Sequence, residues 1–457
     1  MARIERSADT IAQPKPLDWG PVDSPVQQTS LLADIQTFLI QTNISRRSVL
    51  KGALIGAAGI VSTEKAVEIA MGLLEKRERT DWEACNISNK VFCAQNKNAL
   101  ANVALATTFI PDGSLQDMNT SYGKWARQRD EKLIKVIVEE FGIRRVRVGG
   151  MGFNNLVDGN GNITLEFISW LPEYLAEHGV EMDIALGFKN IGYPEMFFPD
   201  MFLKKHHETP PQGGVITLDD ELAKKSLDWS DQICVALGEY SKFITGAQPT
   251  NEPLAKFGPE QQTMGEDYVI ELGKRMARHF PEADIIVSDN AWNFPARGKV
   301  PDILAELKAS GIRNGVFGIN LYRLIPQLYD MTFLPPALRR LDPVLIANLP
   351  GFSLVSDINR VLSMGLKQQF TEVQAEQYGD VTGWDDKEPG NSAIAYRHAI
   401  AGAISLTPGI NDGILPEPVV FSTYSARCLA EAVIYKHLTS DRREMIEFTQ
   451  MLAQQAA

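Results

Sequence analysis

The sequence predicts an α/β protein of the (β/α)8 TIM-barrel class, and three observations support that fold. From about residue 100 onward, apolar runs rich in β-branched residues alternate with amphipathic patterns of helical period. Eight such pairs follow one another along the chain, and this alternation is typical of a parallel sheet. No strand-like run ends in the GxGxxG pattern of dinucleotide-binding sheets, so a doubly wound open sheet is the second choice.

The elements can be assigned in chain order. The strand-like runs are residues 102–110, 143–150, 180–188, 244–253, 283–292, 315–323, 366–376 and 417–424. The helical patterns that follow them are residues 130–142, 165–179, 228–243, 266–280, 300–311, 357–365, 392–406 and 426–438, with a last helix at 441–452. The first helix shows the reasoning: Leu133, Ile134, Ile137 and Val138 recur at helical spacing and form one apolar face. We therefore expect residues 81–457 to form a single barrel with C-terminal helices.

Residues 1–80 are expected to lie outside the barrel as a disordered leader. Within it, residues 45–61 resemble a twin-arginine export signal, because Arg46 and Arg47 precede an apolar run at 53–61. That run is far shorter than the ~20 residues that a membrane span needs, so no integral membrane domain is expected. The resemblance implies export by the twin-arginine machinery to a periplasmic or extracellular location. The alternative is a surface helix that carries two arginines.

Composition excludes several classes of partner and cofactor. The 457 residues carry a formal charge of −12 and are 44% hydrophobic, which suits a soluble protein with a sizeable core but not a nucleic-acid-binding protein. The four cysteines form no CxxC motif and the histidines complete no zinc pattern, so we expect no metal and no cofactor. Cys234 and Cys428 lie in helical patterns as free thiols, whereas a local disulfide between Cys85 and Cys93 remains open.

Polar residues concentrate where the predicted strands end. In a TIM barrel, the active site is built at the C-terminal ends of the strands. The strand ends carry Arg147, Asn251, Glu252, Asp289, Asn290, Trp292, Asn293, Asn320, Tyr322, Glu372, Gln374 and Glu376. Side chains from five different strands are therefore expected to converge on one site.

Two of these carboxylates suggest a specific chemistry. Glu252 ends the fourth strand and Glu372 ends the seventh, on opposite sides of the predicted barrel. Glycosidic cleavage uses such a pair: one protonated acid gives its proton to the departing oxygen, and the other attacks the anomeric carbon or activates water. A separation of about 5–5.5 Å gives a covalent intermediate and retention of configuration.

The motifs around these carboxylates resemble those of the clan A glycoside hydrolases, the cellulase-like superfamily of TIM barrels. Asn251-Glu252-Pro253 matches the Asn-Glu-Pro of that clan at the end of strand four, and Thr371-Glu372 matches its strand-seven Thr-Glu. The resemblance covers about residues 100–440. It implies a retaining glycosidase acting on a β-linked glycan or glycoside, with Glu252 as the acid/base and Glu372 as the nucleophile.

The resemblance also implies roles for neighbouring residues. Asn251 would bind the sugar 2-hydroxyl, while Arg147 on strand two and Tyr322 on strand six would hold the nucleophile. The chain has no tryptophan on strand eight, where many relatives place a sugar-stacking ring. A catalytically inactive barrel that binds carbohydrate or assists envelope assembly is therefore the alternative function.

Two further residues are candidate sugar ligands. Glu376 lies four residues after Glu372, so an extended strand points both side chains to the same face. We expect Glu372 to be the nucleophile and Glu376 to bind sugar hydroxyls nearer the solvent. Trp292 is a candidate for stacking on a sugar ring, with core packing as the alternative.

Overall fold

The structure is a computed structural model. It describes residues 84–191, 196–199, 214–256, 262–291, 297–322, 353–374, 393–412, 415, 417–423 and 425–455. The predicted leader with Arg46 and Arg47 lies outside these residues, as do Trp292 and Glu376.

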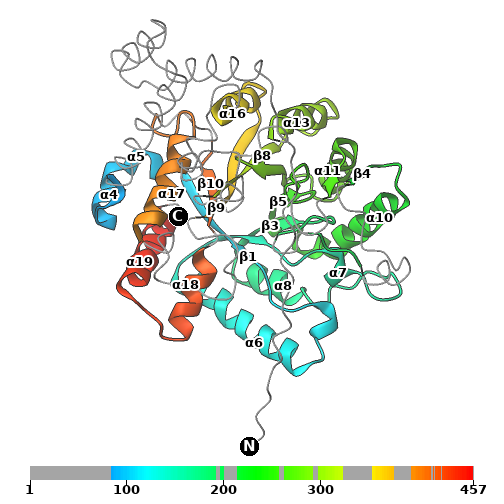
Figure 1. Cartoon of the computed structure of the whole chain (residues 1–457), viewed down its shortest axis with the longest axis horizontal. Helices are drawn as coiled ribbons and strands as arrows, with labels where there is room; N and C mark the ends of the chain where they lie inside the picture. The colour runs from blue at the N-terminus through cyan, green and yellow to red at the C-terminus, as the bar shows by residue number, and fades with distance from the viewer. Residues whose placement is uncertain are drawn as a thin grey trace, which may run out of the picture.

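Eight parallel strands close into a barrel in the order β1-β10-β9-β8-β7-β5-β3-β2 (Figure 1). The barrel strands are β1 (Val103–Phe109), β2 (Arg145–Val148), β3 (Glu181–Ala185), β5 (Ile244–Gln248), β7 (Asp284–Asn290), β8 (Gly315–Tyr322), β9 (Lys367–Gln374) and β10 (Val419–Thr423). A separate two-stranded sheet pairs β4 (Val215–Ile216) with β6 (Thr263–Met264). The (β/α)8 prediction and all eight predicted strands are thus confirmed.

The register of the strands fixes which side chains meet at the C-terminal end. The barrel closes where β1 pairs with β10, from Val103 opposite Val419 to Thr107 opposite Thr423. Between β8 and β9 the register shifts, so that Asn320 lies opposite Glu372. Such a bulge re-aims the side chains that follow it. Here it turns Glu372 toward the residues of β2 and β8.

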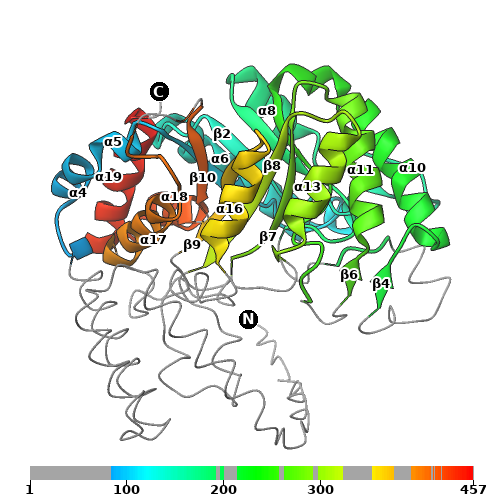
Figure 2. The same cartoon turned by 90° about the horizontal axis from the view of Figure 1, so that it is seen from above.

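Helices cover the outside of the barrel. They are α6 (Ser121–Lys135), which continues as a π-helical turn at Val136–Glu140, α8 (Trp170–Glu177), α10 (Glu221–Ala236), α11 (Glu266–His279), α13 (Val300–Ala309), α16 (Leu354–Ser363), α17 (Ala393–Ser405), α18 (Ser425–Ile434) and α19 (Ser440–Gln455). Shorter helical segments are α4 (Asn89–Gln95), α5 (Lys97–Leu100), α7 (Phe153–Leu156), and the 3-10 turns Leu115–Asp117 and Gly238–Phe243. Figure 2 shows α10, α11, α13 and α16 side by side along one wall. The helix predicted after each strand is confirmed in every case.

The main hydrophobic core lies between the strands and this outer ring of helices. The apolar face predicted for α6 is buried there, since Leu133, Ile134, Ile137 and Val138 have no exposed surface. Burying one such side chain stabilises the fold by about 1.5–3 kcal/mol. Polar side chains point inward from the strands, among them Arg147, Gln248, Ser288 and Asn320, all of which are buried.

Helices α4 and α5 precede the first strand and were not predicted. The ring of Phe92 on α4 packs edge-on against Phe448 of α19, with centroids 5.3 Å apart. The buried Arg397 of α17 donates to the Cys85 carbonyl at 3.0 Å and to Asn89 Oδ1 at 2.7 Å. This N-terminal segment is therefore fastened to the last helices of the barrel.

The cysteines in this segment are free thiols. Cys85 and Cys93 are both buried and unbridged, so the disulfide left open above is not present in the structure. Burial raises the pKa of the Cys93 thiol, with the charge of Arg397 acting in the opposite direction. Cys234 and Cys428 are free as predicted. In the part of the chain that the structure describes, no helix combines the length and apolar character needed to cross a bilayer.

Candidate active site

Five of the predicted site residues come together at the C-terminal ends of β2, β5, β8 and β9. They are Arg147, Asn251, Glu252, Tyr322 and Glu372, and all are buried. The two carboxylates retain only 2% and 5% exposure at Glu252 and Glu372, respectively. In so dry an environment, hydrogen bonds and charges act more strongly than in water.

Arg147 is the central cation of the site. Its guanidinium donates to Glu372 Oε1 at 2.6 Å and to Asn251 Oδ1 at 2.8 Å. The remaining Nε donates to Gln248 Oε1 at 3.0 Å, and Nη1 also reaches the Thr371 carbonyl at 3.3 Å. This planar fork holds the Glu372 carboxylate in one orientation.

Tyr322 links the two glutamates. Its hydroxyl donates to Glu372 Oε2 in a short hydrogen bond and also lies 3.2 Å from Glu252 Oε1. Because a hydrogen bond spans about 2.5–3.2 Å, a hydroxyl in contact with both carboxylates keeps their nearest oxygens within about 6 Å of each other. Glu252 and Glu372 therefore form a close pair across the mouth of the barrel.

The backbone at Glu252 adopts an uncommon conformation. Its φ is +42°, in the left-handed region that residues other than glycine rarely occupy. Such a conformation costs about 1–3 kcal/mol and persists only where the surroundings enforce it. The buried Lys189 is one such restraint, since its Nζ donates to the carbonyls of Glu252 at 2.8 Å and Ala255 at 2.6 Å. These hydrogen bonds help to fix the backbone that directs the Glu252 side chain into the site.

The Glu252 carboxylate is held by neighbours on β8. Asn320 Nδ2 donates to Glu252 Oε1 at 2.5 Å, while the Asn320 Oδ1 accepts from the Thr371 hydroxyl at 2.5 Å. These donors are neutral, whereas Glu372 has a full positive charge beside it. Two buried carboxylates this close cannot both be ionised at low cost. The two carboxyl groups thus differ in their surroundings, with a side-chain amide donating to Glu252 and a guanidinium donating to Glu372.

Gln248 and Ser288 complete the floor of the site. Gln248 Nε2 donates to Ser288 Oγ at 2.6 Å and to the Thr250 carbonyl at 3.1 Å. The amide N–H of Glu252 lies 3.3 Å from the same Ser288 Oγ. Gln248 thus connects Arg147 of β2 to Ser288 of β7.

Three residues of the site were not predicted: Lys189, Gln248 and Ser288. Asn320 appeared among the strand-end polar residues without a role. Lys189 carries a sequence signal, because a lysine directly after an apolar strand is a candidate for the site in a barrel. Gln248 and Ser288 give no such signal, since a single polar residue within a strand is equally compatible with a solvated position.

The predicted roles of Trp292 and Glu376 remain predictions, since both residues lie outside the described part of the chain. Within the described ranges, no group of three or more His, Cys, Asp and Glu side chains is arranged to hold a metal ion.

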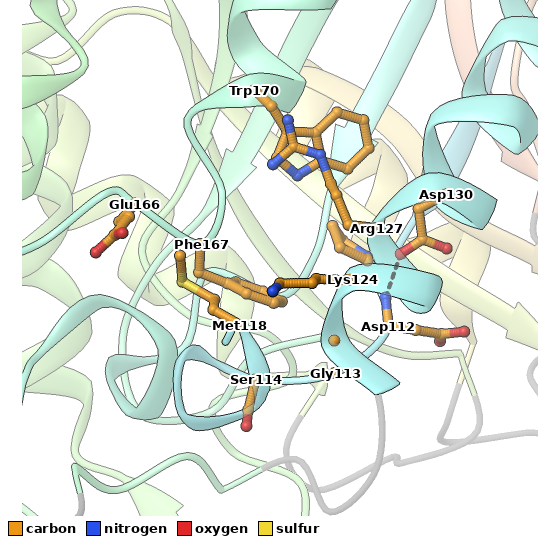
Figure 3. Close-up of a pocket in the computed structure, with 12 residues that line it drawn as sticks. Asp112, Gly113, Ser114, Met118, Lys124, Arg127, Asp130, Glu166, Phe167 and Trp170 are labelled. Carbon is orange, nitrogen blue, oxygen red and sulfur yellow. Dashed lines mark hydrogen bonds between the residues drawn. The ribbon is translucent and has the colours of Figure 1, made fainter. Parts of the chain in front are cut away.

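A second pocket of about 110 Å³ lies beside α6 and α8, and neither Glu252 nor Glu372 is among the residues that line it (Figure 3). The guanidinium of Arg127 stacks over the ring of Trp170 there, 4.5 Å from its centroid. Among the residues that line the pocket, Asp130 Oδ2 accepts from the Asp112 amide at 2.5 Å. Burial raises the pKa of Asp130 to about 6, although the charges of Arg427 and Arg129 oppose the shift.

Asp130 is expected to make the stability of the protein depend on pH. Its folded-state pKa of about 6 lies above the ordinary value of 3.8, so the folded form binds the proton more tightly. The resulting stabilisation is present below pH 3.8 and is lost as the pH rises through about 6. Asp130→Asn keeps an acceptor for the Asp112 amide and removes the titration.

Chemical denaturation of both proteins between pH 4 and 8 measures this effect. We expect the stability of the wild type relative to Asp130→Asn to fall by roughly 2–3 kcal/mol across that range. A difference that stays constant with pH would show that Asp130 keeps its ordinary pKa in the folded state.

Among known proteins, the chain is similar to several solved structures. No protein-family model matches the chain, and no curated protein sequence matches it. A GH10 xylanase of Thermobacillus composti is 13% identical in sequence, with a TM-score of 0.43. The matched region spans 77% of this chain and 99% of the xylanase. Xylanase B of Clostridium stercorarium F9 is 14% identical, covering 72% and 87% with a TM-score of 0.42. A thermostable mutant of the xylanase Xyn10A of Cellvibrio japonicus is 12% identical, covering 71% and 87% with a TM-score of 0.43. The barrel assignment itself rests on the strand order described above.

Proposed function

We propose that the protein is a retaining glycoside hydrolase that cleaves a β-linked glycan or glycoside by double displacement, with Glu252 and Glu372 as its two catalytic residues. The observation that carries this proposal is the Tyr322 hydroxyl in contact with both carboxylates. It keeps their nearest oxygens within about 6 Å, which supports the close carboxyl pair of retaining enzymes, ~5–5.5 Å apart, over the wider pair of inverting ones, ~6.5–9.5 Å apart.

In the first step, a Glu372 carboxylate oxygen attacks the anomeric carbon while Glu252 gives its proton to the glycosidic oxygen. The bond between the anomeric carbon and that oxygen breaks, and the departing sugar leaves as an alcohol. The sugar is then an ester of Glu372. The hydrogen bonds from Arg147 and Tyr322 hold the attacking carboxylate in place before the reaction.

In the second step, Glu252 acts as the base. Its carboxylate takes a proton from a water molecule, whose oxygen attacks the anomeric carbon and displaces Glu372. Two displacements at one carbon return the original anomeric configuration. Once Glu372 is released as an anion, Arg147 again stabilises its charge.

Asn251 is positioned to contact the substrate. Its Oδ1 accepts from Arg147 Nη2 at 2.8 Å and lies 3.3 Å from Gln248 Nε2. These contacts fix the orientation of the amide and leave Nδ2 as the group that donates to a sugar hydroxyl. The proposal assigns this contact to the 2-hydroxyl, beside the carbon that Glu372 attacks.

Tyr322→Phe tests the link between the two glutamates. The substitution keeps the ring and removes the hydroxyl that contacts both carboxylates. We expect kcat to fall about 10- to 100-fold, because the nucleophile loses a charge-assisted hydrogen bond that fixes its position. Steady-state kinetics and thermal unfolding measure the effect, and an unchanged kcat would remove Tyr322 from the catalytic arrangement.

A screen of aryl β-glycosides and polysaccharides tests the function itself. Wild type, Glu252→Gln and Glu372→Gln are compared, since each variant keeps the side-chain shape and removes the acid or the nucleophile. We expect activity in the wild type alone. Equal inertness of all three proteins, with retained glycan binding, would favour the non-catalytic carbohydrate-binding alternative.

The export proposal rests on the sequence alone. Arg46 and Arg47 with the apolar run at 53–61 are the features that the twin-arginine machinery would recognise. Cell fractionation of the full chain and of a variant with both arginines changed to lysine tests it. Equal distribution of the two proteins between compartments would contradict the proposal.

A further inference from the structure

We infer that Asn290 is a substrate-binding residue whose side-chain amide takes two neighbouring hydroxyls of the sugar beside Glu252. The inference rests on the proposed function and deepens it, because it defines a hydroxyl pattern that the substrate must present. It is supported by the position of Asn290 on β7 and by the lack of hydrogen-bond partners for both polar atoms of its side chain.

Asn290 is the last residue of β7, at the end of the barrel where the carboxylates lie. Ser288, two residues earlier, contacts Gln248 and the Glu252 amide and so faces the site. Residues two apart on a strand share a face, so Asn290 faces the same interior one layer nearer the mouth. Across the ladder it lies opposite Asn320, which holds the Glu252 carboxylate.

Both polar atoms of the Asn290 side chain are unsatisfied. The residue has no exposed surface, and neither Nδ2 nor Oδ1 has a hydrogen-bond partner. Leaving buried polar groups unpaired is costly, so folded proteins rarely retain them without a reason. By contrast, both amide atoms of Asn320 are hydrogen-bonded.

The substrate can supply the missing partners. Asn290 lies opposite Asn320, whose amide donates to Glu252, so a sugar bound against Glu252 comes to lie beside Asn290. An asparagine amide presents one acceptor and one donor side by side. Of two adjacent sugar hydroxyls, one donates to Oδ1 and the other accepts from Nδ2. A sugar that lacks either hydroxyl leaves half of the amide unpaired and is discriminated against.

The experiment compares Asn290→Ala with the wild type on the glycoside that the wild type cleaves best. Loss of two neutral hydrogen bonds should lower kcat/KM about 10- to 100-fold, mainly through KM. Affinity for the same glycoside, titrated into Glu252→Gln and into Glu252→Gln/Asn290→Ala, should fall by a similar factor. Because the substitution removes unpaired buried atoms, Tm should stay unchanged or rise.

Gln368→Ala is the matched control. Gln368 is also buried with both amide atoms unpaired. It shares its strand face with Phe370, which packs on Phe421 in the outer core, so it points away from the site. We expect Gln368→Ala to leave kcat/KM unchanged and Tm unchanged or higher.

A series of deoxy glycosides provides the second readout. If Asn290 binds two hydroxyls, the wild type should cleave an analogue that lacks one of them with a lower kcat/KM. On that analogue, Asn290→Ala should lower kcat/KM by a smaller factor than on the full glycoside. Unchanged kcat/KM in Asn290→Ala, or a loss that is the same on every analogue and accompanies a lower Tm, would overturn the inference. Active wild type with an equally active Asn290→Ala would refute this inference alone, whereas a wild type that neither cleaves nor binds any glycan would refute the proposed function and the inference with it.

Discussion

Glu372→Ala is expected to lower the rate of glycoside cleavage by about 10⁴-fold or more. The substitution removes the atom that forms the covalent bond to the sugar, and the loss of a nucleophile has an effect of this order in other enzymes. It also leaves the buried Arg147 without the carboxylate that lies 2.6 Å from it, so we expect the protein to be less stable by about 3–5 kcal/mol.

Adding azide to Glu372→Ala shows whether the lower rate reflects the missing nucleophile or a misfolded protein. The anion fits the space that the Glu372 side chain vacates, beside the positive charge of Arg147. It should attack the anomeric carbon from that side, restore part of the rate on a substrate with a good leaving group, and give a glycosyl azide of inverted configuration. Proton NMR of the product identifies the configuration. A variant that keeps more than a tenth of the wild-type rate without azide would exclude Glu372 as the nucleophile.

Glu252→Ala is expected to show a loss that depends on the leaving group. Without the acid, substrates with a poor leaving group should react about 10²- to 10⁴-fold more slowly, because the departing oxygen receives no proton. A dinitrophenolate leaves unaided, so formation of the Glu372 ester should remain fast and an initial burst of phenolate should appear. The burst is measured by stopped-flow absorbance.

Azide again reports on the role of the residue. With Glu252 removed, azide should attack the Glu372 ester from the face that water normally uses, giving a glycosyl azide of retained configuration. Equal losses on good and poor leaving groups, or an inverted azide product, would contradict the assignment of Glu252 as acid/base. Opposite product configurations from the two variants therefore distinguish the two glutamates.

The barrel was predictable because each unit carries its own local signal. β-Branched runs such as those of β1 and β7 and the apolar face of α6 are decided by residues close together in the chain. Helices α4 and α5 were missed because they lie in a polar stretch. Their stability depends on distant contacts, such as that of Phe92 with Phe448 and the hydrogen bonds from Arg397.

The candidate site was predictable in part. The rule that barrel strands deliver active-site residues at their C-terminal ends identified Arg147, Glu252 and Glu372, which the structure places together. The left-handed backbone of Glu252 and its support by Lys189 depend on contacts across 63 positions of sequence. Likewise, Asn290 was visible as a strand-end residue, but only the folded chain shows its amide atoms to be unpaired.

The central claim is that the sugar becomes covalently attached to Glu372. Incubation with a panel of 2,4-dinitrophenyl 2-deoxy-2-fluoro-β-glycosides tests it most directly, because the fluorine slows both steps while the dinitrophenolate keeps the first one fast enough to accumulate the ester. Intact-mass spectrometry should show the mass of one fluorosugar added per chain, and peptide mapping should place it on Glu372. Attachment to another residue, or turnover of the ordinary glycoside to a product of inverted configuration, would contradict the proposed mechanism.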